Sequence, residues 1–285
     1  MVGKIIKAIS GFYYIECENI VYECRAKGIL KKKNVSPLVG DFAEFNIISE
    51  GNGNLIKVIN RKNSLIRPPV ANLDLIIIVM SSQNPEPSLL FLDKQLAFLE
   101  YANIKPIICI NKSDLSYVDE IIGIYRKIGY TVVVTSAKDN EGIDILKEAI
   151  SGKTVALVGN SGVGKSSITN CLLKDKVMVE GNLSKIERGK QTTRHSEMLK
   201  IDNNTYIIDT PGFSSFDLPN IKLNELAGLF VEFRYEFKNC KYNNCRHILE
   251  EDCGVRKAIL DGKISQSRFE NFKLLYEELS KRKIY

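Results

Sequence analysis

Residues 154–166, with the sequence TVALVGNSGVGKS, decide the fold of the central part of this chain. The segment opens with an apolar run typical of a buried strand, continues as G-x-x-x-x-G-K-S, and leads into a helical pattern. In that context the backbone N–H groups and a helix N-terminus can face a phosphate chain, while Lys165 reaches the terminal phosphates and the Ser166 hydroxyl ligates Mg²⁺. A chance glycine-rich turn is the alternative, which the flanking strand and helix disfavour. The predicted nucleotide contacts are Gly159, Asn160, Ser161, Gly162, Val163, Gly164, Lys165, Ser166 and Ser167.

A second phosphate motif, Asp209-Thr210-Pro211-Gly212, follows the apolar stretch TYIID. This places Asp209 at a strand end, where its carboxylate can hold Mg²⁺ through the water shell of the ion. Gly212 can offer its backbone N–H to the γ-phosphate. Alone, the tetrapeptide could be a simple turn, but its position downstream of the first motif favours a phosphate site.

Two tetrapeptides upstream indicate which base is bound. Asn111-Lys112-Ser113-Asp114 and Thr135-Ser136-Ala137-Lys138 each follow an apolar strand. The Asp114 carboxylate can accept from the ring N–H and the exocyclic amine, which guanine has and adenine lacks. Asn111 can contact the other base edge, Lys112 can lie against the base, and the backbone of Ser136 and Ala137 can contact the guanine carbonyl. Together with the phosphate motifs they favour GTP over ATP, and the candidate base contacts are Asn111, Lys112, Asp114, Ser136, Ala137 and Lys138.

The order of these motifs is unusual. Common small GTPases place guanine recognition after the phosphate motifs, whereas here both base motifs come first. This order indicates a circular permutation, which a parallel sheet tolerates if the old ends are joined, as the helical stretch within residues 136–154 can do. Apolar strands alternating with helices over residues 69–218 predict such a sheet with helices on both faces, that is, an α/β P-loop GTPase domain.

Residues 1–68 have a different sequence pattern, without the alternation of strands and helices. Five short β-rich stretches separated by turn signals predict a small OB-type β-barrel. The run Lys31-Lys32-Lys33 lies in the long connection between the third and fourth strands, and aromatic residues could supply stacking faces for RNA. The alternative is that the aromatics are core residues and the lysines are merely solvated. The aromatic residues concerned are Phe12, Tyr13, Tyr14 and Tyr22.

Residues 219–285 read as a mostly helical third domain, with apolar helical spacing over 223–233 and 267–279. Between these stretches Cys240, Cys245, His247 and Cys253 fall within 14 residues. Three thiolates and one imidazole suit tetrahedral Zn²⁺, and four protein ligands leave no open position for a catalytic water. We therefore predict one structural zinc ion, against the alternative that these residues cluster by accident.

Charge and composition limit the function classes. The chain has 285 residues, 44% of them hydrophobic, so we expect a folded globular protein. Its apolar runs are too short to span a bilayer and no secretory segment opens the sequence, so we expect neither a membrane protein nor an exported one. The net charge of +6 divides into +5 for residues 1–68, −2 for 69–218 and +3 for 219–285. Two basic flanking segments around an acidic centre suit a protein whose flanks bind a polyanion, although excess lysine can also simply make a surface more soluble.

A barrel, a permuted GTPase and a Cys/His-bearing helical tail together resemble the ribosome small subunit-dependent GTPase A (RsgA) family, over essentially the whole chain. The resemblance implies a cytoplasmic GTPase that acts late in maturation of the small ribosomal subunit, with GTP or GDP, Mg²⁺ and rRNA as partners. It implies Zn²⁺ on the cysteine and histidine cluster. It also places the Mg²⁺-binding switch threonine at Thr193, beside Ser166 and Asp209 as magnesium ligands.

The group that orients the attacking water is not evident. Many RsgA members have histidine before the threonine pair, where this chain has Gln191. Phe213, after Gly212, occupies a place where many GTPases have glutamine. The candidates for this role are Gln191, a neighbouring side chain of the same loop, and a group on the ribosome. The expected catalytic residues are Lys165, Gln191, Thr193 and Gly212.

Three functions compete. The leading hypothesis is a GTPase whose hydrolysis is stimulated by the small subunit and coupled to release from it. The second is a GTP-switched rRNA-binding module with negligible turnover. The third, a permuted GTPase of the large subunit, is not expected to combine this barrel with this tail. The sequence shows no oligomer signal, so we expect a monomer.

Overall fold

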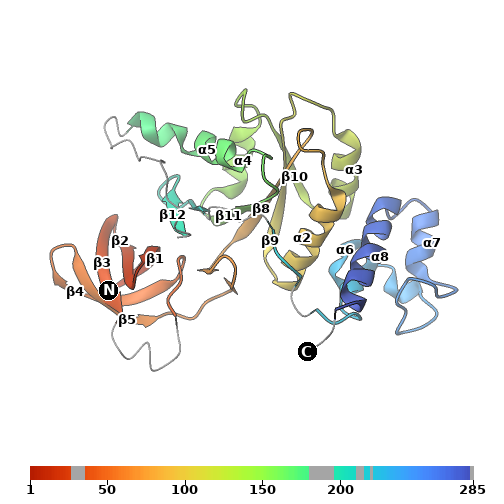
Figure 1. The fold of residues 1–285 in the computed structure, drawn as a ribbon, viewed down its shortest axis with the longest axis horizontal. Helices are drawn as coiled ribbons and strands as arrows, with labels where there is room; N and C mark the ends of the chain where they lie inside the picture. Colours follow the sequence, from red (N-terminus) through yellow and green to blue (C-terminus); the bar gives the residue numbers. More distant parts are fainter. Residues whose placement is uncertain (27–35, 180–195, 210–214, 219–220, 283–285) are drawn as a thin grey trace.

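The computed structural model describes residues 1–26, 36–179, 196–209, 215–218 and 221–282. A small barrel, a central α/β unit and a C-terminal group of helices follow one another along the chain and across the molecule (Figure 1). In these ranges no helix has both the length and the apolarity needed to cross a bilayer.

The N-terminal part is a five-stranded barrel, as predicted. Strand β1 pairs with β2, β2 with β3, β3 with β5, β5 with β4, and β4 returns to β1 to close the barrel. Tyr22 packs against Phe45 inside the barrel, so this aromatic residue belongs to the core, whereas Phe12, Tyr13 and Tyr14 stay partly exposed. The strands are β1 Val2–Ile9, β2 Phe12–Cys17, β3 Ile20–Ala26, β4 Phe42–Ser49 and β5 Asn52–Val58.

The central unit is a mostly parallel sheet with helices on both faces, again as predicted. Its strand order is β10-β9-β8-β11-β13-β12, in which only β12 runs antiparallel to its neighbour. Helices α2 and α3 cover one face, and α4 and α5 cover the other. Every residue of β8 is buried, because a strand covered on both faces has no solvent side.

The elements of this unit have the following bounds: β8 Leu75–Ser81, α2 Leu89–Tyr101, β9 Lys105–Asn111, α3 Asp119–Ile128, β10 Thr131–Thr135, α4 Ile143–Ile150, β11 Thr154–Val158, α5 Lys165–Val179, β12 Glu197–Lys200 and β13 Tyr206–Asp209. A short hairpin of β6 Ser64–Leu65 and β7 Val70–Ala71 precedes them.

The C-terminal part packs a cluster of phenylalanines against α2. Residues 223–233, predicted as a helix, instead form a 3-10 turn and one helical turn with Phe230 extended between them. Gly228 weakens the helix there, and the break lets both Phe230 and Phe233 reach the core. The elements are η1 Leu226–Leu229, α6 Val231–Arg234, η2 Phe237–Asn239, α7 Gly254–Leu260 and α8 Gln266–Ser280.

The barrel and the central sheet are joined edge to edge. Strand β1 pairs with β12 at Lys7 and Glu197, whose side chains also form a 3.0 Å ion pair. Glu16 of the barrel accepts from Lys200 Nζ at 2.6 Å and from Tyr206 Oη at 2.7 Å. The β12–β13 hairpin therefore connects the GTPase unit physically to the barrel.

Candidate functional site

The phosphate loop connects β11 to α5, and its backbone needs glycine. Gly159, Gly162 and Gly164 all have positive φ angles, of 156°, 82° and 96°. A Cβ on Gly159 would lie 2.2 Å from the carbonyl oxygen of Val79, so the loop can pass this close to β8 only without a side chain. Lys165 Nζ folds back over the loop and donates to the carbonyls of Gly159 at 2.6 Å and Asn160 at 2.9 Å. Burial lowers the pKa of this ammonium group.

Asn111 links the base motifs to the phosphate loop. Its amide nitrogen donates to the carbonyl of Val163 at 2.9 Å, and its amide oxygen accepts from Thr135 Oγ1 and Ala137 N, both at 3.1 Å. The residue is 2% exposed. Asn111 thus holds three loops together in the structure, while its predicted contact with the base edge stays a prediction.

Asp114 lines a pocket of about 320 Å³ built from both base motifs and the phosphate loop. Its Oδ1 lies 3.0 Å from Ser136 Oγ, and its Oδ2 lies 3.7 Å from Lys138 Nζ. Its position allows the carboxylate to accept from a base edge. The pocket is lined by Asn111, Lys112, Asp114, Leu115, Ala137, Lys138, Gly164 and Ser167.

The sheet topology explains how distant motifs meet. Strands β9, β8 and β11 are parallel neighbours, and β10 lies beyond β9 (Figure 1). Their carboxyl ends therefore share one edge of the sheet, where ligands bind in open α/β folds. Asp209 ends β13, which pairs in parallel with β11. Thr193, Gln191, Gly212, Phe213 and the Lys31-Lys32-Lys33 run lie outside the described residues.

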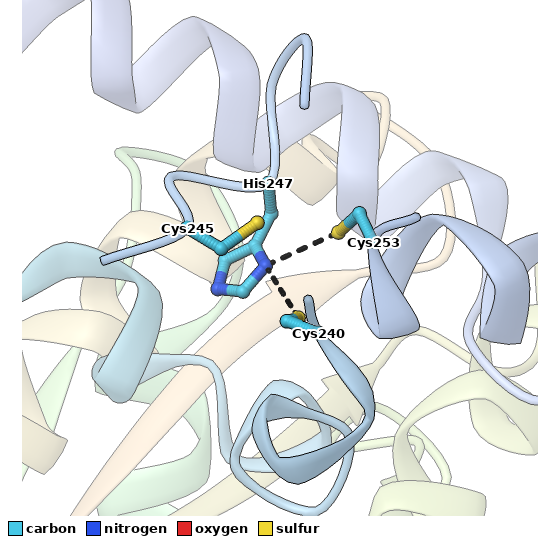
Figure 2. Close-up of side chains that lie close together, drawn as sticks. All are labelled: Cys240, Cys245, His247 and Cys253. Atoms are coloured by element: carbon cyan, nitrogen blue, oxygen red, sulfur yellow. Dashed lines mark hydrogen bonds between the residues drawn. The ribbon is translucent and has the colours of Figure 1, made fainter. Parts of the chain in front are cut away.

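The four predicted metal ligands come together. One ligand atom from each of Cys240, Cys245, His247 and Cys253 lies within 4.8 Å of the others. Figure 2 shows His247 Nδ1 directed at two of the thiols, 3.3 Å from Cys253 Sγ and 3.6 Å from Cys240 Sγ. In a tetrahedral zinc site, a metal–sulfur bond of about 2.3 Å and a metal–nitrogen bond of about 2.0 Å place the two ligand atoms about 3.5 Å apart, so these nitrogen–sulfur spacings fit a single ion.

The surroundings of the cluster agree with a structural metal. His247 is 3% exposed and Cys253 is 5% exposed. The His247 ring stacks on the half-exposed Phe237 at 4.9 Å and meets the buried Phe233 ring edge-on at 6.2 Å, so the cluster is tied to the aromatic core through Phe233. Burial raises the pKa of the Cys245 thiol to about 12 and raises that of Cys253, while it lowers the pKa of His247. The imidazole is therefore neutral and able to ligate near neutral pH, whereas the thiols must lose their protons to solvent when they bind a metal.

Replacing Cys245 with serine should remove the metal and loosen the C-terminal part, because metal binding contributes directly to folding free energy. Metal content by mass spectrometry under native conditions and hydrogen exchange of α8 would report both effects. Since thiolates bind the metal, affinity of the wild-type chain should fall as the pH is lowered from about 8 to 6. Cys17→Ser, outside the cluster, is the control. Unchanged metal content in Cys245→Ser would contradict the assignment.

A buried polar network, which the sequence did not reveal, joins the GTPase unit to the C-terminal helices. Arg268 on α8 is 1% exposed and donates to Asp93 at 2.6 Å and to Glu232 at 2.7 Å. Asp93, on α2, also accepts from Tyr125 Oη at 2.6 Å and from Asn271 Nδ2 at 2.7 Å. Burial alone would lower the pKa of Arg268, but the two carboxylates outweigh it and hold that pKa well above its ordinary value.

The same helix α2 holds the chain downstream of the second phosphate motif. Gln95 is fully buried, and its amide oxygen accepts from Phe216 N at 2.7 Å while its amide nitrogen donates to Phe216 O at 3.2 Å. The Phe98 and Phe216 rings stack with centroids 4.2 Å apart. No periodicity signal distinguishes Asp93 or Gln95 from polar surface residues of a helix, so only the packed structure identifies them.

Comparison with known proteins agrees with this architecture. The RsgA GTPase family model matches residues 58–219, and the RsgA N-terminal domain model matches residues 2–55. Relatives named small ribosomal subunit biogenesis GTPase RsgA include one from Agathobacter rectalis, 45% identical over 302 residues and 100% of both chains. Another, from Alkaliphilus metalliredigens, is 43% identical over 289 residues and 99% of both chains.

Solved structures are similar over nearly the whole chain. YjeQ from Thermotoga maritima has a TM-score of 0.86 at 34% identity, covering 99% of both chains. YloQ, described as a circularly permuted GTPase, has a TM-score of 0.84 at 34% identity, covering 100% of this chain and 96% of its own. The fold and the site thus define a circularly permuted P-loop GTPase with a barrel before it and a Cys/His cluster after it. The chain belongs to the RsgA family.

Proposed function

We propose that this protein hydrolyses GTP while bound to the small ribosomal subunit, assists the late maturation of that subunit, and leaves it after hydrolysis. The observation that carries the proposal is the pocket where both base motifs meet the phosphate loop, at the carboxyl ends of the parallel strands. The names of the relatives supply the partner, since they are small ribosomal subunit biogenesis GTPases.

The proposed roles follow from chemistry and position. Asp114 reads the guanine edge, with Asn111, Lys112 and the Ser136–Lys138 segment around the base. The backbone of the phosphate loop holds the phosphates, and Lys165 stabilises charge on them. The proposed Mg²⁺ ligands are Ser166, Thr193 and Asp209, with Gly212 on the γ-phosphate and Gln191 as candidate for orienting water. The proposed metal of the Cys/His cluster is one structural Zn²⁺, because three thiolates and one imidazole are a typical zinc set.

We assign domains at residues 1–68, 69–218 and 219–285, in which the two outer domains bind rRNA and the central one binds nucleotide. Net charges of +5 and +3 on the flanks favour phosphate backbone there. The protein acts in the cytoplasm as a monomer in this proposal.

Coupling between nucleotide and rRNA follows from the two junctions. The chain leaving the second phosphate motif is clamped at Phe216 by Gln95 of α2, and the neighbouring Asp93 holds α8. The β12–β13 hairpin, which leads into Asp209, is attached to the barrel through Glu16. A change at the γ-phosphate can therefore reach both flanks through packed elements. By reciprocity, a subunit that favours the GTP form must also make the protein bind GTP more tightly.

Turnover of GTP measured with and without purified small subunits tests the proposal. We expect slow hydrolysis by the free protein and a marked increase with small subunits, and tighter cosedimentation with a non-hydrolysable GTP analogue than with GDP. Large subunits are the matched control and should stimulate nothing. Fast turnover without subunits would contradict the coupling, and GTP-dependent binding without stimulated turnover would establish the alternative, a GTP-switched rRNA-binding module.

A further inference from the structure

A cavity of about 530 Å³ lies beside the Cys/His cluster and shares no residue with the guanine pocket. Cys240, Cys245 and His247 contribute to one wall, and Phe272 and Tyr276 of α8 contribute to another. Its volume falls in the range of pockets that hold a small organic ligand. Because three residues of the cluster line the cavity, a metal bound by the cluster would also fix the shape of this cavity.

Aromatic rings border the cavity and remain open to solvent. Tyr242 is 48% exposed and Phe237 is 37% exposed, although the His247 ring already stacks on Phe237. Lys241 Nζ lies 5.7 Å from the centre of the Tyr242 ring. Accessible aromatic rings beside a cation are a typical stacking surface for nucleobases.

Three side-chain amides, those of Asn224, Asn243 and Asn244, also line the cavity. Within the part of the chain that the structure describes, none of them has a hydrogen-bonding partner. An amide offers both a donor and an acceptor, which is the combination that the edges of nucleobases require. These groups are therefore available to a ligand that carries donors and acceptors of its own.

The charge of the lining favours a polyanion. Arg246 is the single charged residue among those that line the cavity, and in the described ranges it has no ion pair. Two carboxylates of the following loop are engaged: Glu250 accepts from the backbone of residues 246, 248 and 249, and Asp252 pairs with Lys241. A phosphate attached to a bound base would meet a free guanidinium group and no opposing carboxylate in the lining.

We propose that this cavity binds one unpaired nucleobase of single-stranded RNA, with Tyr242 as the stacking surface, the asparagine amides on the base edge and Arg246 on the adjoining phosphate. The inference rests on the proposed function, which brings rRNA to this part of the chain. An apolar peptide segment is a poorer occupant, because it would leave three amides and a guanidinium group without partners at its interface.

The test measures binding of the full-length, zinc-loaded chain to short single-stranded RNA oligonucleotides of A, C, G or U by fluorescence anisotropy. Tyr242→Ala should weaken binding of the preferred oligonucleotide roughly 5- to 150-fold, and Tyr242→Phe should restore it because the ring is kept. Tyr235→Ala is the matched control, since Tyr235 is 70% exposed in the same domain but does not line the cavity. Ultraviolet crosslinking should join the RNA to the peptide containing residues 240–246.

Metal content of each variant shows whether the domain is intact, because Tyr242 is not a ligand of the cluster. Equal affinities for Tyr242→Ala and Tyr235→Ala, equal binding of single-stranded and duplex RNA, or crosslinks only outside the cavity would overturn the inference. GTP turnover of the wild-type chain with small subunits separates the two proposals. If small subunits stimulate GTP turnover normally but Tyr242→Ala does not change RNA affinity, only the proposed base pocket is wrong. If the crosslink depends on Tyr242 but small subunits do not stimulate GTP turnover, only the proposed function is wrong.

Discussion

Replacing Lys165 with alanine should lower subunit-stimulated GTP turnover roughly 100- to 1,000-fold, the usual cost of removing one charge-stabilising group from a preorganised site. Phosphoryl transfer depends almost entirely on positioning and charge stabilisation, so the loss of this ammonium group has no substitute within the loop. The structure already holds Lys165 Nζ over the loop through the carbonyls of Gly159 and Asn160. Single-turnover hydrolysis with small subunits would measure the effect.

Two controls separate phosphate from base recognition. Lys105→Ala should change turnover little, because this exposed lysine opens β9, at the strand end away from the nucleotide pocket. Asp114→Asn should weaken the binding of GTP but strengthen the binding of xanthosine triphosphate, because the additional carbonyl of xanthine needs a hydrogen-bond donor where guanine presents an amine. Lys165→Ala should instead reduce the turnover of both nucleotides to the same extent. Turnover of Lys165→Ala within a few-fold of wild type would show that another group stabilises the transferring phosphate.

Replacing Asp93 with alanine should destabilise the contact between α2 and α8 by roughly 3 kcal/mol, the lower end of the usual cost of breaking a buried ion pair, because Arg268 keeps its second carboxylate partner, Glu232. Arg268 is 1% exposed, so water cannot replace the missing carboxylate without opening the interface. The change also leaves Tyr125 Oη and Asn271 Nδ2 without the acceptor they use in the structure. Hydrogen exchange along α8 would measure the loss of protection.

Lys94→Ala is the matched control on the same helix. Lys94 pairs with Glu278 of α8 at 2.9 Å, but both side chains are partly exposed, so its removal should cost at most about 1 kcal/mol. If Asp93→Ala and Lys94→Ala lowered protection of α8 equally, the buried network would not be what holds the C-terminal helices. If Asp93→Ala also abolished the difference between GTP and GDP in subunit binding, α2 would be the coupling element.

Much of the fold could be predicted because the decisive patterns are local. Short β-rich stretches in residues 1–68 predicted the barrel, and apolar strands alternating with helices over residues 69–218 predicted a parallel sheet covered on both faces. The break at Gly228 was missed, since the apolar spacing of 223–233 fits a continuous helix and only the packing of Phe230 and Phe233 decides against it.

The candidate site divides in the same way. Spacing and the flanking strands predicted the phosphate loop, the two base motifs and the four metal ligands, and the structure brings together those residues that it describes. The contact of Asn111 with the base stays a prediction, and in the structure its amide also joins three loops. The sequence could not show this, because Val163 and Asn111 are neighbours only after the sheet has formed.

By itself, the sequence determined the kinds of element, the order of the nucleotide motifs and the donor set of the predicted metal site, because each depends on residues close together in the chain. Tertiary structure alone decided which polar residues are buried and which residues are their hydrogen-bond or ion-pair partners. Asp93 and Arg268 are 175 positions apart, and Gln95 and Phe216 are 121 apart. A charged residue on a helix looks the same in a sequence whether it faces water or a buried partner. Burial and hydrogen bonding arise only when distant elements pack, which is why the junctions and the cavity beside the cluster became visible only in the folded chain.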